Sequence, residues 1–155
     1  VAEQILRDGN FTEAPIYIPE VYQLYPNIRL ISDANLQTPV ETVREGEGET
    51  LITTVQFRGP DMRPFIRFLL AKELFRFLCE SKNPIASVFI NSPKEILDIQ
   101  GNIFAGMLLV PAHLLRKEVD RIDCSMDIIS QLADSFWVSK SLMNQRMRDF
   151  MENMN

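Results

Sequence analysis

The fold of this chain is decided by the stretch Arg67-Phe68-Leu69-Leu70-Ala71-Lys72-Glu73-Leu74-Phe75-Arg76-Phe77-Leu78. It lies within a longer run, residues 62–81, whose apolar residues recur at spacings of three and four, as in a helix. Because apolar residues lie on most faces of this helix, we expect it to be central and buried. Asp61 is the expected N-cap, and Asn83-Pro84 is expected to end the helix.

Within this helix, Lys72-Glu73-Leu74-Phe75-Arg76 has the spacing of the H-E-x-x-H motif of zinc metallopeptidases. In that motif two histidines on one helix face bind Zn²⁺, and the glutamate acts as general base. Here Glu73 is present, but Lys72 and Arg76 occupy the two ligand positions. A protonated amine or guanidinium has no lone pair to donate, so the sequence predicts that no zinc binds at these positions.

The remaining sequence predicts an α+β fold, in which a small twisted sheet of about three strands packs against the central helix. Strands are expected at 28–31, 40–44, 50–57 and 86–90. The acidic, glycine-rich segment 45–49 predicts an exposed hairpin tip. Helices are expected before Gly9, at 20–25, 93–109 and 111–118, and as a pair within 126–151, with Ser92 and Ser139 as N-caps. We expect one domain at 1–125 and a helical, helix-turn-helix-like subdomain at 126–155.

Composition limits the classes of protein to which the chain belongs. With 46% apolar and 24% charged residues among 155, a soluble globular protein is expected. The net charge of −5 argues against a surface that coats nucleic acid. The two cysteines, of which Cys79 is expected to be a buried free thiol, fit a reducing compartment. No signal peptide and no run of about 18 apolar residues is visible, so we expect a cytoplasmic protein without a membrane span.

Three segments, in order, resemble motifs of the ImmA/IrrE family of metallopeptidase-like proteins. Residues 67–78 are similar to the family's R-F-x-x-A-H-E-[LI]-G-H-x-[LI]. Residues 98–111 are similar to E-x-x-A-[ND]-x-F-A-x-x-L-L-M-P, and residues 132–139, followed by Arg146, to L-A-x-x-F-x-V-S and a later arginine. Together they cover most of 60–150. The resemblance implies a zincin-like fold with a helical C-terminal subdomain.

The residues that differ from these motifs stand at the positions of the zinc ligands and beside them. The resemblance implies zinc ligands at the positions of Lys72, Arg76 and Asp98, where the family has two histidines and a glutamate. Phe75 replaces a glycine that keeps the helix surface open. Only Glu73, at the general-base position, is unchanged, and without a metal it has no activated water to deprotonate. We therefore expect no zinc, no other cofactor and a catalytically inactive protein, a pseudopeptidase.

Two arrangements of the replaced residues are open. In one, Lys72, Arg76 and Asp98 form a salt-bridge cluster, with Glu73 nearby, whose cations replace the charge of zinc and relieve repulsion between carboxylates. In the other, Lys72 and Arg76 face solvent along an open groove. A zinc site elsewhere would combine His113, the only histidine, with Cys79 and Asp98, and their spacing does not support it.

The resemblance also implies a function, because the family's enzymes cleave or control repressor-type transcription regulators, often in mobile elements or stress responses. We expect a protein-binding role in such a system. The expected partner is a helix-turn-helix repressor or a toxin-antitoxin component, docked on the groove beside Glu73 and Arg76. The enzymatic alternative is a divergent metallo-endopeptidase that uses Glu73 and Asp98 to cleave a repressor.

A second alternative is a DNA-binding regulator. Residues 128–150 have the outline of a helix-turn-helix, and its second helix carries Lys140, Arg146 and Arg148 as candidate DNA contacts. Structural packing is the favoured interpretation of this segment, because the chain as a whole is acidic.

Overall fold

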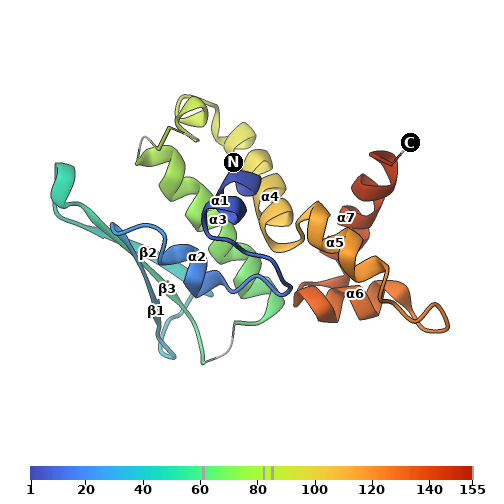
Figure 1. The fold of residues 1–155 in the computed structure, drawn as a ribbon. Helices are drawn as coiled ribbons and strands as arrows, with labels where there is room; N and C mark the ends of the chain where they lie inside the picture. The colour runs from blue at the N-terminus through green and yellow to red at the C-terminus, as the bar shows by residue number, and fades with distance from the viewer. Residues whose placement is uncertain (61, 82, 85, 155) are drawn as a thin grey trace.

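Helix α3 (Pro64–Glu80) lies at the centre of the fold, between a three-stranded sheet and helix α4 (Lys94–Leu109) (Figure 1). The computed structural model describes residues 1–60, 62–81, 83, 84 and 86–154. The buried residues of α3 are Ile66, Arg67, Leu70, Ala71, Leu74, Phe75, Leu78 and Cys79. The predicted central helix and the buried Cys79 are therefore confirmed, whereas Phe65, at the start of α3, is 61% exposed. The predicted N-cap Asp61 lies outside the described residues.

The sheet has the strand order β1-β3-β2. Strand β1 (Ile28–Ser32) runs parallel to β3 (Ile52–Phe57), and β2 (Val40–Glu45) runs antiparallel to it. Alternate residues of β3 are buried, with Thr53, Val55 and Phe57 forming the covered side, as expected for a sheet with one face on a core. The predicted hairpin of β2 and β3 is confirmed, and its tip contains the 3-10 turn η1 (Gly48–Thr50).

Two short N-terminal helices cover the central layer. Helix α1 (Ala2–Asp8) packs against α4, and α2 (Ile18–Tyr22) packs against α3 and β1. Helix α2 begins two residues before its predicted start, because Pro19 fits the first turn, where a missing N–H has no cost.

The predicted strand at 86–90 is wrong. This segment forms the 3-10 turn η2 (Ser87–Phe89). Its amides bond locally, with the Phe89 amide donating to the Ala86 carbonyl at 3.1 Å and the Ile90 amide to the Ser87 carbonyl at 3.2 Å. The predicted N-cap Ser92 is also wrong by one position, because Pro93 is the N-cap of α4.

Three further helices complete the chain: α5 (Ala112–Val119), α6 (Ile128–Phe136) and α7 (Lys140–Glu152) (Figure 1). The Ser139 cap is confirmed, since its Oγ accepts a hydrogen bond from the Leu142 amide at 3.1 Å. Helix α6 packs on α5 and α7, and α7 also contacts α4. The division into domains at residue 125 stays a prediction. No helix among the described residues has the length and apolar character that a membrane span requires.

Candidate functional site

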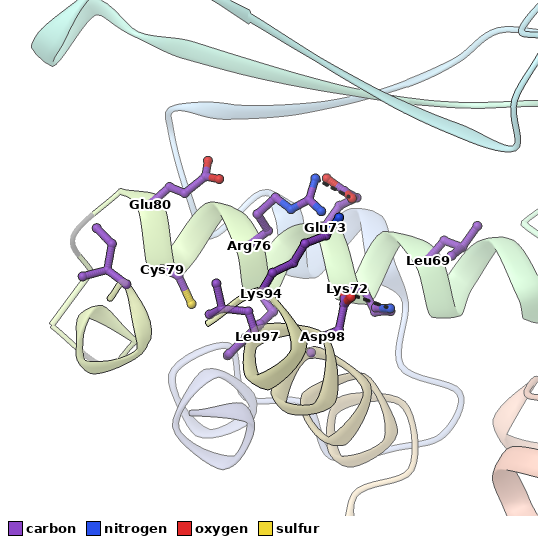
Figure 2. Close-up of a pocket in the computed structure, with 12 residues that line it drawn as sticks. Leu69, Lys72, Glu73, Arg76, Cys79, Glu80, Lys94, Leu97 and Asp98 are labelled. Carbon is purple, nitrogen blue, oxygen red and sulfur yellow. Dashed lines mark ion pairs between the residues drawn. The ribbon is translucent and has the colours of Figure 1, made fainter. Parts of the chain in front are cut away.

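A groove of about 390 Å³ runs along α3 where α4 crosses it (Figure 2). Lys72, Glu73 and Arg76 come from α3 and Asp98 from α4, so the structure brings together all four residues that the sequence singled out. The other lining residues are Leu69, Phe75, Cys79, Glu80, Ile90, Lys94, Leu97 and Gly101. The groove is therefore a mixed site, with charged groups above apolar walls.

The charged groups form two separate pairs and not one cluster. Lys72 Nζ lies 4.0 Å from Asp98 Oδ1, and Arg76 Nη1 lies 3.6 Å from Glu73 Oε1 (Figure 2). The Arg76 and Asp98 side chains are each 56% exposed, whereas Lys72 is 27% exposed. The result combines the two arrangements that the sequence left open: the cations are paired, and the Arg76 head also faces solvent.

Glu73 is held in place from the sheet. Its Oε2 accepts a hydrogen bond from Thr42 Oγ1 of β2 at 2.8 Å, while its other oxygen faces Arg76. Farther along α3, Glu80 forms an ion pair with Arg44 of the same strand. Both contacts tie the hairpin to the wall of the groove, and neither partner on β2 was predicted from the sequence, because the register of a distant strand is not a local property.

Phe75 occupies the position where the resemblance places a glycine. It is buried, and its ring packs against Phe104 of α4 at 5.2 Å and Phe89 of η2 at 5.7 Å between centroids. Such tilted aromatic pairs stabilise a contact beyond the area they bury. The ring therefore closes the helix surface at this point and joins α3 to the segment that enters α4.

Cys79 is the nucleophile candidate that lines the groove. Burial raises the pKa of its thiol, and the charge of Glu80 raises it further. A raised pKa favours the neutral thiol, which is a poor nucleophile. The surroundings of Cys79 therefore do not activate its thiol.

Comparison with known proteins assigns the chain to a family. Residues 65–148, more than half of the chain, match the IrrE N-terminal-like domain. The chain belongs to the IrrE N-terminal-like domain family. A solved structure, a Mycobacterium tuberculosis transcriptional regulator, superposes on this IrrE-like chain with a TM-score of 0.63 at 18% identity. The match covers 94% of this chain but only 44% of the regulator, so the chain spans less than half of that protein's length, and the likeness concerns the fold alone. None of the curated proteins matches the chain.

The family implies a zinc ion, and the donor set of this IrrE-like groove does not fit one. Two of the three ligand positions carry the cations Lys72 and Arg76, which offer no lone pair and would repel a divalent ion. The described residues contain no group of three histidine, cysteine or carboxylate side chains able to hold a metal. His113 is exposed on α5 and does not line the groove with Cys79 and Asp98.

The candidate DNA contacts of this IrrE-like chain divide into two kinds. Arg146 is 13% exposed, and its Nε and Nη2 donate to the Val110 carbonyl at 3.2 and 3.0 Å, so it holds α7 against the end of α4. Lys140 and Arg148 are exposed on α7. Arg146 is therefore a packing residue, and DNA binding through the other two stays a prediction.

Proposed function

We propose that this chain is a metallopeptidase-like protein that does not catalyse peptide hydrolysis and acts by binding another protein. The proposal rests on the residues that occupy the positions of the family's zinc ligands. Lys72 and Arg76 stand on the groove floor and form ion pairs with Asp98 and Glu73, the two carboxylates of the former site. Glu73 therefore faces a guanidinium and a threonine hydroxyl where a general base would need a water activated by a metal.

The charges of the groove support repurposing over simple loss of the metal. A metallopeptidase site that loses only its zinc keeps carboxylates near one another, and their repulsion raises a pKa and destabilises the fold. Here two cations supply the missing positive charge. Each pair has one partner that is 56% exposed, however, and ion pairs open to solvent contribute only about 0–1 kcal/mol to stability. The small gain in stability therefore gives a weak explanation for charged groups on the floor of an open groove. Recognition of a partner by these groups explains them better.

The proposed role is regulatory. The family and the fold shared with a transcriptional regulator support a function in the control of transcription. The proposed setting is a mobile element, a stress response or a toxin-antitoxin system. The proposed partner is a protein such as a helix-turn-helix repressor, and the proposed docking surface is the groove along α3. In this role the chain would bind the kind of protein that an active relative cleaves and would leave it intact.

The deciding experiment measures zinc in the purified chain after incubation with excess zinc and removal of free metal. We expect well below one zinc per chain. The variant Lys72→His/Arg76→His/Asp98→Glu restores the ligand set and is expected to retain about one zinc. A matched control, Lys140→His/Asn144→His, places two histidines four apart on the exposed face of α7, without a third ligand or a groove, and is expected to lose its zinc on washing.

The enzymatic alternative gives the opposite results. Stoichiometric zinc in the unmodified chain, together with cleavage of casein or a repressor that is lost in Glu73→Gln, would replace this proposal with a divergent endopeptidase. If neither zinc nor cleavage is found, the non-catalytic proposal stands.

A further inference from the structure

The groove gathers three cationic side chains around one end of α4. Lys72 and Arg76 rise from α3, and Lys94, the first residue of α4, extends toward the Glu73–Arg76 pair (Figure 2). All three line the same cavity. Lys94 was not singled out by the sequence, because it lies outside the motif positions.

The carboxylates of the groove do not balance these cations. Glu80 is neutralised by Arg44, which reaches it from the hairpin. Glu73 is already engaged by the Thr42 hydroxyl and Arg76. Three cations therefore face two carboxylates, Glu73 and Asp98, in a chain whose net charge is −5. With Glu80 neutralised by Arg44, the groove therefore has an excess of one positive charge, on a protein that is acidic as a whole.

Lys94 is a cation at the end of a helix that disfavours one. The N-terminus of a helix carries partial positive charge, so a lysine in the first turn of the 16-residue α4 is unfavourable. Among the described residues Lys94 forms no ion pair that would offset this effect. The N-cap Pro93 also provides no side-chain hydrogen bond, so the first amides of α4 add to the positive potential at this end of the groove.

The walls beside these cations are apolar. Phe75 is buried, Leu97 is half-buried, and Ile90 is 41% exposed. A volume of about 390 Å³ is near the lower end of the ~300–1,000 Å³ typical of ligand pockets, so it admits a few side chains and not a folded element. A suitable occupant combines one anionic group with apolar neighbours.

We propose that the groove binds a peptide segment of a partner protein in which an aspartate or glutamate is flanked by apolar residues. The acidic side chain lies between Arg76 and Lys94, and the apolar neighbours pack on Ile90 and Leu97. This inference rests on the proposed function, because it names the chemistry of the partner that occupies the groove. It predicts that binding weakens as salt concentration rises, since exposed charges are screened.

A display library of random peptides, panned against the full chain, tests the preference directly, because panning needs no identified partner. Selected peptides are expected to share an acidic residue between apolar ones. The affinity of one such peptide, measured by fluorescence anisotropy, is expected to fall about tenfold or more on Lys94→Glu. The matched control Lys117→Glu reverses an exposed cation on α5, outside the groove, and is expected to leave affinity unchanged.

A charge exchange gives the sharpest result. Replacing the acidic residue of the peptide by lysine should abolish binding to the unmodified chain and restore it to Lys94→Glu. Circular dichroism of Lys94→Glu checks that the exposed substitution leaves the fold intact. Three outcomes would each overturn this inference. Panning selects no peptides, it selects peptides without acidic residues, or the selected peptides bind Lys94→Glu as tightly as the unmodified chain.

The outcomes separate this inference from the function on which it rests. If the selected peptides bind in the groove but share no acidic residue, this inference is wrong, and the proposed function as a non-catalytic binding protein still holds. Zinc-dependent cleavage of the selected peptides contradicts the proposed function itself. Self-association that Lys94→Glu abolishes, with no peptide selected, would identify the occupant as the acidic tip of a second copy and overturn the partner-peptide assignment.

Discussion

Arg67 and Arg76 lie on the same helix and have opposite environments. Arg67 is fully buried, and its Nε donates to the Trp137 carbonyl at 3.0 Å while Nη2 donates to the Phe136 carbonyl at 3.3 Å. Its guanidinium also stacks on the Trp137 ring at 5.1 Å. Arg76 is 56% exposed and has one ionic contact, to Glu73 at 3.6 Å. The two are separated by about two and a half helical turns, which places them on opposite faces of α3.

The comparison shows how a cation is buried without a carboxylate. The acceptors of Arg67 are carbonyls at the end of α6, where helix geometry leaves such groups without partners and the helix dipole is negative. Burial still lowers the pKa of Arg67 to about 10, because the charged form loses hydration. Trp137 adopts φ 54°, a left-handed conformation usual for glycine at a helix end, and this directs its carbonyl and ring toward Arg67. Arg67 therefore belongs to the fold, and Arg76 to the groove.

The largest expected effect comes from removing each arginine in turn. Arg67→Ala leaves a cavity and two carbonyls without their donor, so we expect a loss of about 3–5 kcal/mol in the free energy of unfolding. Arg76→Ala removes one 3.6 Å ion pair made by an exposed guanidinium and is expected to change the free energy of unfolding by less than about 0.5 kcal/mol. Urea unfolding followed by circular dichroism measures both. Equal losses for the two variants would break the comparison.

A smaller effect is expected on the packed side of α3. Tyr22 Oη donates to the Leu70 carbonyl at 2.7 Å, and Tyr22→Phe should cost about 1 kcal/mol at neutral pH. Burial raises the pKa of Tyr22 well above its ordinary value of 10, and the charge of Glu73 raises it further. The unfolded phenol ionises near pH 10 while the folded one stays neutral, so this contribution is present below about pH 10 and is lost as pH rises above it.

The pH series distinguishes this linkage from a simple packing loss. The stability difference between the unmodified chain and Tyr22→Phe is expected to shrink above about pH 10, as measured by urea unfolding at several pH values. Tyr17→Phe serves as the control, because Tyr17 is 53% exposed and its removal should leave stability unchanged. A stability difference that stays constant from neutral to alkaline pH would contradict the proposed linkage.

The features that could be predicted from the sequence are those that depend on residues close together in the chain. The central helix, the hairpin and the Ser139 cap follow from apolar spacing and turn chemistry within a few residues. Residues 86–90 were predicted as a strand because an apolar run with β-branched residues carries no information on whether an edge is available for pairing. The hydrogen-bond acceptors of Arg67 could not be predicted from local patterns either, because they lie 70 and 69 residues away in the sequence.

The candidate site was predictable to a similar degree. The family motifs placed Lys72, Glu73, Arg76 and Asp98 at one site, and the structure brings them together. They did not predict that Arg76 pairs with Glu73 and leaves Asp98 to Lys72, because both carboxylates lie within reach of long, flexible side chains. The expected absence of zinc stays a prediction for elemental analysis.

The smallest expected effect is a gain on the groove side. Gly101 lies inside α4, and a Cβ added there would lie 3.6 Å from both Lys72 Cε and Phe75 Cδ1, which is ordinary contact. Gly101→Ala should therefore raise the free energy of unfolding by about 0.5–1 kcal/mol, because alanine loses less backbone entropy in a helix. Gly106→Ala on the same helix is the matched control, since its Cβ would meet Arg146 Cδ at 3.3 Å and Leu142 Cδ1 at 3.4 Å. A smaller gain is expected at Gly106, because these closer side chains must shift to admit a methyl group, and a larger gain there than at Gly101 would mean that the junction of α4 with α7 has more room than the groove.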